Sequence, residues 1–135
     1  MDEGTHAQLE ARAESVEASA SQLVNRYVKE GLRMDDHPAI KFVTTSEGRR
    51  AVLASRPRLS VVNLLGTWQA ERQNVRETAR YFEISEDDVR AAIRYYSAFR
   101  NELDEEIRQH LAAQRNFKRA LEHRDARARR RVAGG

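Results

Sequence analysis

The chain has 135 residues, with 33% charged and 40% hydrophobic side chains, no cysteine and a formal net charge of +3. This length allows one domain with appendages, and the lack of cysteine excludes a disulfide framework and thiol chemistry. No apolar run is long enough to cross a membrane and no secretory signal opens the sequence, so we expect a cytoplasmic protein.

The charge is distributed unevenly along the chain. Residues 1–36 carry 4 basic and 8 acidic side chains, residues 37–100 carry 11 and 7, and residues 101–135 carry 9 and 6. A basic excess confined to the middle and the end is typical of a chain that binds a polyanion or an acidic protein there. We expect the same three ranges to be structural divisions.

Residues 1–36 are predicted to form a helical hairpin that serves dimerisation. Ser19 and Gln22 have the spacing of a capping box and separate a weakly amphipathic helix, His6–Ala18, from a second helix, Ala20–Met34. Two short helices around a Ser-rich turn resemble the helical part of ribbon-helix-helix antitoxins, which dimerise and bind operator DNA. The residues before the first helix are too few for the DNA-reading strand of that class. Either that strand is absent from this chain, or the helices serve dimerisation alone, or they form an ordinary helical hairpin.

A small β-hairpin is predicted to follow Pro38, which forces its predecessor out of the helical region. Apolar and polar residues alternate over 39–43 and, less strictly, over 50–53, and Gly48 supplies the turn between them. We expect Arg56-Pro57-Arg58 to end this hairpin.

Ser60 is predicted to cap the most apolar helix of the chain, which runs to about Arg72. Its Val and Leu side chains recur at helical spacing and Trp68 continues the same apolar surface. We expect this helix, Trp68 included, to form the core on which the following helices pack.

Residues 74–99 have the pattern of a helix-turn-helix. Asn74 with Glu77 forms one capping box, and Ser85 opens the second helix in the same way. Glu83 lies where this motif usually has a left-handed glycine, so it must tolerate that conformation or avoid it. Two capped helices around a turn also occur in helical domains that bind no DNA.

If this motif binds DNA, its exposed arginines and those beside the hairpin tip are expected to contact phosphates. The second helix, however, opens with Glu86-Asp87-Asp88, which favour the helix dipole but repel DNA. In addition, Asp87 lies one turn from Arg90 and can pair with it. The predicted DNA-binding residues are Arg49, Arg50, Arg76, Arg80, Arg90 and Arg94.

Asn101 is predicted to cap a long amphipathic helix. Acidic residues fill its first turn, and apolar residues then recur every three to four positions as a narrow seam. Such a seam requires a partner, which could be a second copy, the N-terminal helices or a groove of another protein. The Arg-rich residues 118–131 are expected to stay disordered until an acidic partner orders them.

The sequence contains no pattern of catalytic or metal-ligating residues. The four histidines lie in four different segments, and there is no phosphate-binding Gly loop or nucleophile elbow. We therefore expect no enzymatic activity, cofactor or metal. The predicted fold is mainly α: a ribbon-helix-helix-like helical hairpin (1–36), a β-hairpin with a helix-turn-helix bundle (37–100) and a long C-terminal amphipathic helix with a basic tail (101–135).

Four segments in succession, HPAIKFV, EGRRAVL, VVNLLGTWQAE and VRETARYFEISEDDVRAAIRYYSAFRNELDEEI, resemble a bacterial antitoxin family. Its members pair a hairpin with a helix-turn-helix domain of formerly unknown function. The resemblance covers about residues 37–107, and EGLRMDDHP extends it towards VapB-type antitoxins. It implies two activities, namely binding the operon's own promoter and neutralising a PIN-like ribonuclease toxin.

PIN-like nucleases hold Mg²⁺ in a cluster of carboxylates, so an inhibitor arginine can displace metal or substrate by pairing with them. The C-terminal helix offers apolar anchors for a groove and then guanidinium groups for an acidic site. The predicted toxin-binding residues are Leu103, Ile107, Leu111, Arg115, Phe117, Lys118, Arg119, Leu121, Arg124 and Arg127. The alternatives are a stand-alone DNA-binding regulator and a helical adaptor that binds no DNA.

Overall fold

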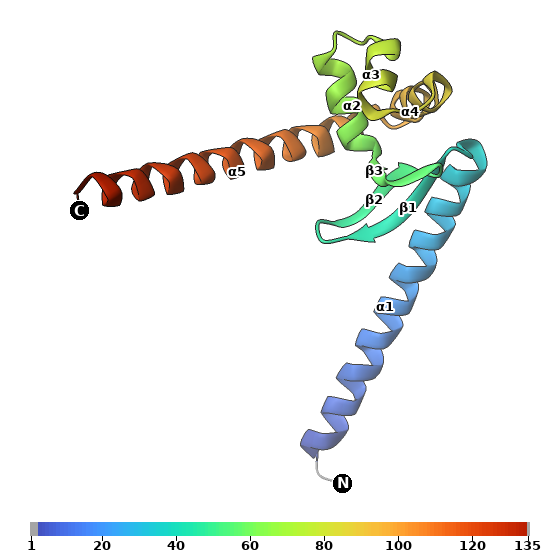
Figure 1. Ribbon diagram of the computed structural model, residues 1–135. Helices are drawn as coiled ribbons and strands as arrows, with labels where there is room; N and C mark the ends of the chain where they lie inside the picture. The colour runs from blue at the N-terminus through green and yellow to red at the C-terminus, as the bar shows by residue number, and fades with distance from the viewer. Residues whose placement is uncertain (1–2, 135) are drawn as a thin grey trace. The chain divides into compact units, whose positions relative to one another are not determined.

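The computed structural model describes residues 3–134, with side chains described for residues 19–132. The chain divides into two compact units, residues 1–38 and residues 39–135, and is mainly helical with one small sheet (Figure 1). Among the described residues, no helix combines the length and apolarity that a membrane span requires.

The first unit consists of one helix, α1, which extends from Glu3 to Asp36. The predicted hairpin of two helices is therefore wrong. No Gly or Pro interrupts the sequence between Gly4 and Gly31, and serines are tolerated inside a helix when nothing else ends it. The C-terminal half of α1 exposes a stripe of large apolar side chains: Leu23, Val24, Tyr27, Val28 and Leu32.

The second unit begins with an antiparallel sheet of order β1-β2-β3. The predicted hairpin is confirmed as β1 (Ile40–Thr45) and β2 (Gly48–Leu53), which pair from Ile40–Leu53 to Thr45–Gly48. Gly48 has φ 105°, and the Thr45 hydroxyl donates to its carbonyl oxygen at 2.8 Å. This positive φ is the reason that glycine occupies the turn.

A third strand, β3 (Arg56–Ser60), pairs antiparallel with β2. The prediction that Arg56-Pro57-Arg58 ends the hairpin is wrong. Pro57 is tolerated because β3 lies at the edge of the sheet, where one side of the strand needs no ladder hydrogen bonds. Arginines and a proline on an edge strand also discourage pairing with other chains.

The side-chain caps of three helices are confirmed. Ser60 Oγ accepts from Asn63 N at the start of α2 (Val61–Ala70), and Asn74 Oδ1 accepts from Glu77 N at the start of α3 (Val75–Phe82). Ser85 caps α4 (Glu86–Ala98) in the same way. The first of these helices ends before Arg72, because Arg72 and Gln73 adopt positive φ and turn the chain into α3.

The core of the second unit lies between the sheet and the helices. Strand β2, helix α2 and helix α4 contribute most of its fully buried side chains, among them Leu53, Leu64, Leu65, Val89 and Tyr95. Trp68 is 8% exposed, which confirms its place in the core, and it packs edge-to-face on Tyr96 at 6.3 Å between ring centroids.

Helix α5 extends from Arg100 to Gly134. Leu103 N donates to Phe99 O at 3.0 Å, so the chain before Arg100 takes the capping position predicted for Asn101, which lies inside the helix. The basic tail is helical up to Gly134, and the prediction that it is disordered is wrong. Arg, Ala and Leu are good helix formers, and they make up most of residues 111–131.

Candidate partner-binding and DNA-binding surfaces

The predicted toxin-binding seam divides into a buried part and an exposed part. Leu103 and Ile107 are 2% and 3% exposed and belong to the core of the second unit. Their assignment to a partner interface is therefore wrong, because α5 packs its first turns against α2. Leu111, Phe117 and Leu121 are 41%, 67% and 43% exposed.

The exposed residues continue the face of α5 that is buried in the core. Leu103 and Ile107 are followed by Leu111, Leu121 and Val132 at intervals that return to the same side of a helix after whole turns. We call residues 111–132 the projecting helix. Within the second unit this apolar face is largely exposed from Leu111 onward, whereas it packs in the core one turn earlier.

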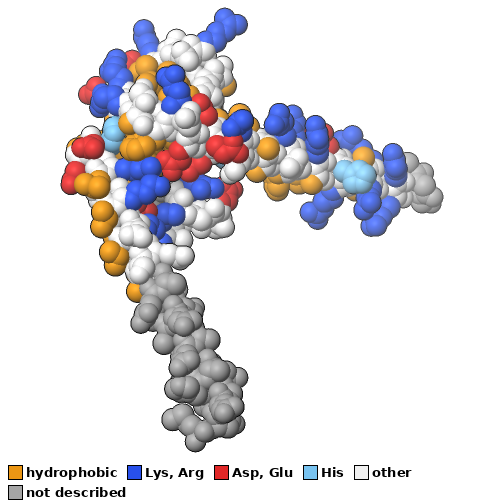
Figure 2. Space-filling model, turned by 180° about the vertical axis from the view of Figure 1, so that it is seen from behind, with side chains coloured by type: hydrophobic (Ala, Val, Ile, Leu, Met, Phe, Trp, Pro, Cys, Tyr) orange, Lys and Arg blue, Asp and Glu red, His pale blue; other side chains and the backbone are white. Residues whose placement is uncertain are grey.

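The projecting helix is strongly basic. Residues 111–135 carry 8 basic side chains and 2 acidic ones. Figure 2 shows hydrophobic side chains along one edge of α5 near the core and Lys and Arg side chains around the rest of it. The predicted basic contacts Arg115, Lys118, Arg119, Arg124 and Arg127 are all exposed. The projecting helix thus combines an exposed apolar face with an excess of positive charge.

The first turn of α4 does not have the character of a base-reading surface. Its three carboxylates all have partners within the chain: Asp88 accepts from Ser55 Oγ at 2.9 Å, and Glu86 and Asp87 pair with Arg90 at 3.4 and 3.3 Å. The guanidinium of Arg90 is therefore engaged. The exposed group of Glu86, Asp87 and Arg90 keeps a net negative charge.

The other predicted DNA contacts lie on three elements, α3, α4 and β2. Arg76, Arg80 and Arg94 are exposed on α3 and α4, and within residues 19–132 none of them forms an ion pair. Arg49 on β2 donates to Thr44 Oγ1 at 3.0 Å. Arg50 lines a cavity of about 420 Å³ together with residues of α5, among them Glu106 and His110.

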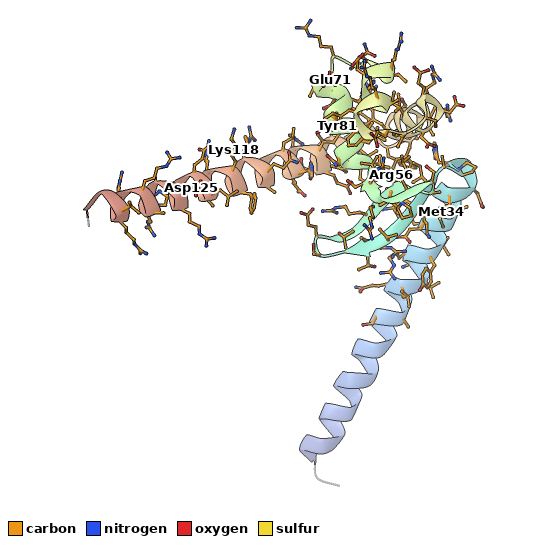
Figure 3. All side chains as sticks on the ribbon, in the orientation of Figure 1. Met34, Arg56, Glu71, Tyr81, Lys118 and Asp125 are labelled. Carbon is orange, nitrogen blue, oxygen red and sulfur yellow. The ribbon has the colours of Figure 1, made fainter. Side chains whose placement is uncertain are left out.

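Two further arginines, missed in the sequence, line a cleft between β3 and the end of α3. The β3–α3 cleft has a volume of about 300 Å³. Arg56 and Tyr81, which form part of it, are labelled in Figure 3. The two arginines of Arg56-Pro57-Arg58 are visible in the sequence. Because the sequence does not predict strand β3, it does not show that they lie beside the end of α3. The lining residues are Arg56, Arg58, Leu59, Asn63, Tyr81, Phe82 and Glu83.

The junction of α4 and α5 carries a titratable group whose pKa is shifted. The Tyr96 hydroxyl donates to Asp104 Oδ1 at 2.6 Å. This hydrogen bond, together with burial and the charge of Asp104, raises the pKa of Tyr96 above its usual 10.0. Arg100 lies over the same ring, 5.4 Å from its centroid. The junction therefore fixes the direction in which α5 leaves the core.

Across residues 19–132, no group of three or more His, Asp or Glu side chains is arranged to hold a metal ion. No family model, curated protein or solved structure matches the chain. The function therefore has to be inferred from the two surfaces, the projecting helix and the exposed arginines around α3.

Proposed function

We propose that the protein is the antitoxin of a type II toxin–antitoxin system. In this proposal the projecting helix neutralises a PIN-like ribonuclease and the helix-turn-helix unit binds the operator of the operon. The observation that carries it is the split face of α5, in which Leu103 is 2% exposed while Phe117, on the projecting helix, is 67% exposed.

The split face supports binding of a folded protein partner. A single helix in water gains little stability from its own hydrogen bonds and is held by the burial of an apolar face. Burying an exposed Phe or Leu side chain contributes about 1.5 to 3 kcal/mol. Phe117 and Leu121, one turn apart, form a pair of anchors of the kind that an amphipathic helix inserts into a groove.

The surrounding arginines support an acidic partner. A guanidinium pairs with a carboxylate through two parallel hydrogen bonds, and a cluster of metal-binding carboxylates is a natural target. Arg124 and Arg127 follow the apolar anchors along the helix, so once Phe117 and Leu121 are seated they extend further over the partner. In this proposal they occupy the Mg²⁺ site of the nuclease.

Operator binding rests on the exposed arginines of the helix-turn-helix. Arg76, Arg80 and Arg94 can contact phosphates, whereas Arg90 is held by Glu86 and Asp87. We propose that the apolar stripe of α1 joins two copies into a homodimer, which would present two such units to a palindromic operator. The alternatives are a DNA-only regulator and an adaptor without DNA binding.

Co-expression tests the proposal. The full-length chain, tagged, is produced together with the PIN-like nuclease encoded beside it, and the complex is purified and assayed for Mg²⁺-dependent RNA cleavage. We expect a stable complex without cleavage activity, and cleavage when the nuclease is assayed alone. A DNA-only regulator would bind the promoter fragment in a salt-sensitive manner but leave the nuclease fully active. An adaptor would do neither.

A further inference from the structure

The β3–α3 cleft brings together side chains from three elements that suit a phosphodiester. Arg58 lies on β3, Asn63 on α2 and Tyr81 on α3, around a volume of about 300 Å³. The side chain of Arg58 is exposed, and its guanidinium forms no hydrogen bond or ion pair within the described part of the chain. Its full set of guanidinium donors is therefore free for a ligand.

We propose that this cleft binds a phosphodiester of the operator backbone, with Arg58 as the main cation. The inference rests on the proposed DNA binding and changes which surface of the protein faces the duplex. It places part of the duplex against β3 and the end of α3, next to the first turn of α4, where Asp88 accepts a hydrogen bond from Ser55 Oγ at 2.9 Å. Neither Arg58 nor Tyr81 is among the residues that the sequence predicts to bind DNA.

Arg56 prepares the cleft for an anion. Its guanidinium donates through Nη1 to the carbonyl oxygen of Phe82, the last residue of α3. The C-terminal end of a helix carries a partial negative charge, which would repel a phosphate. A guanidinium on that carbonyl opposes the repulsion, and the remaining N–H groups of Arg56 stay available because arginine has five donors.

Tyr81 forms the outer wall of the cleft. The residue is 67% exposed, and its ring is held edge-on against Phe82 with 4.8 Å between ring centroids. A fixed, exposed tyrosine can donate its hydroxyl to a phosphate oxygen or pack against a sugar. A free phosphate ion bound at Arg58 would leave this ring uncovered, whereas an extended sugar–phosphate chain covers both.

Glu83 is the one acidic side chain that lines the cleft, beside Arg56 and Arg58. Its carboxylate repels a phosphate, so its removal must strengthen binding if the cleft holds one. Arg58 and Glu83 thus give tests of opposite sign within one site. A protein in which arginines merely protect the edge of β3 would show neither effect.

The test uses the full-length chain and a fluorescent promoter duplex, titrated by anisotropy over a series of KCl concentrations. Arg58→Gln is expected to weaken binding and to reduce the slope of log K against log salt by about 0.9, which corresponds to one phosphate contact. Glu83→Gln is expected to tighten binding. Arg108→Gln is the matched control, because Arg108 is an exposed arginine on α5 already paired with Glu105.

Equal slopes for the wild type, Arg58→Gln and Arg108→Gln would overturn the inference while leaving operator binding intact. Inorganic phosphate, titrated alone, separates the two possible sources of the ligand. If it shifts the amide resonances of the cleft in a manner that depends on Arg58 while the duplex does not, the cleft holds a free anion and the inference is wrong. If the wild type ignores the duplex altogether, operator binding fails as well, and nuclease inhibition is unaffected.

Discussion

Tyr96 donates its hydroxyl proton to Asp104 Oδ1 at 2.6 Å and thereby ties the last turns of α4 to the first turns of α5. The projecting helix starts two turns after Asp104, so its direction depends on this junction. The burial of Leu103 and Ile107 fixes the same turns from the other side. A helix that presents its apolar face in a defined direction is better suited to a rigid groove than a flexible tail is.

The Tyr96–Asp104 hydrogen bond predicts a pH dependence of stability. The pKa of Tyr96 is raised in the folded state, so the unfolded chain loses its proton first as the pH rises. The contribution is complete below pH 10.0, the unfolded value, and is lost above it. Tyr96→Phe should lower the free energy of unfolding by about 1 kcal/mol at neutral pH.

Urea unfolding followed by circular dichroism at neutral and at alkaline pH measures this difference. We expect the gap between the wild type and Tyr96→Phe to narrow above pH 10.0. Tyr81→Phe, at an exposed tyrosine, is the control and should show no such gap. A gap that stays constant with pH would show that the hydrogen bond does not contribute.

Glu83 predicts a stabilising substitution. The residue has φ 56° and ψ 46°, the left-handed conformation that costs a residue with a side chain about 1 to 2 kcal/mol. Glu83→Gly relieves this strain at some cost in chain entropy. We therefore expect the free energy of unfolding, measured by thermal unfolding, to rise by about 0.5 to 1 kcal/mol. Glu71→Gly, at a helix end with φ −87°, should give no gain. Equal effects at the two sites would contradict the assignment of strain.

The two parts of the α5 seam predict mutational effects on stability of very different size. Leu103→Ala should lower the free energy of unfolding by about 2 to 5 kcal/mol, because it opens a cavity in the core. Leu121→Ala, at a residue that is 43% exposed, should change it by less than about 0.5 kcal/mol. Chemical denaturation of both variants shows whether Leu121 contributes to the core, as Leu103 does, or lies outside it. Equal losses would show that the projecting helix packs on the core.

The ion pairs of α4 predict which arginine contributes to the affinity for operator DNA. Arg90 is shared between Glu86 and Asp87, whereas Arg80 forms no ion pair within the described residues. Arg80→Gln should therefore reduce the salt dependence of operator binding by about 0.9 in slope, and Arg90→Gln should leave it unchanged. If Arg90→Gln has the larger effect, α4 faces the DNA.

Several elements were predictable from the sequence because their signals are local. Asn74, Ser60 and Ser85 cap their helices with their own side chains, and a cap needs only the next three residues. The turn at Gly48 is also determined locally, by the positive φ of this glycine. The left-handed position at Glu83 was also predicted correctly from the helix-turn-helix pattern, although glutamate rarely adopts this conformation.

Other features depend on contacts that the sequence does not contain. Strand β3 forms because β2 offers an open edge, and neither Pro57 nor its neighbouring arginines favour a strand by themselves. The capping signature at Ser19 predicts the start of a helix. Ser19 lies inside the continuous helix α1, where such a pattern does not interrupt the helix. The boundary between core and interface on α5 depends on which of its turns pack against α2, which no periodicity reveals.

The most direct test of the proposed function is the affinity of the full-length chain for the purified PIN-like nuclease, measured by isothermal titration calorimetry. We predict that Phe117→Ser combined with Leu121→Ser weakens binding at least about 100-fold, since each anchor contributes about 1.5 to 3 kcal/mol. The control, Val24→Ser with Val28→Ser, removes two apolar side chains that are 59% and 57% exposed on the proposed dimer face of α1, and this variant should bind the nuclease like the wild type. Unchanged affinity in the α5 variant, or loss only in the α1 variant, would contradict the account.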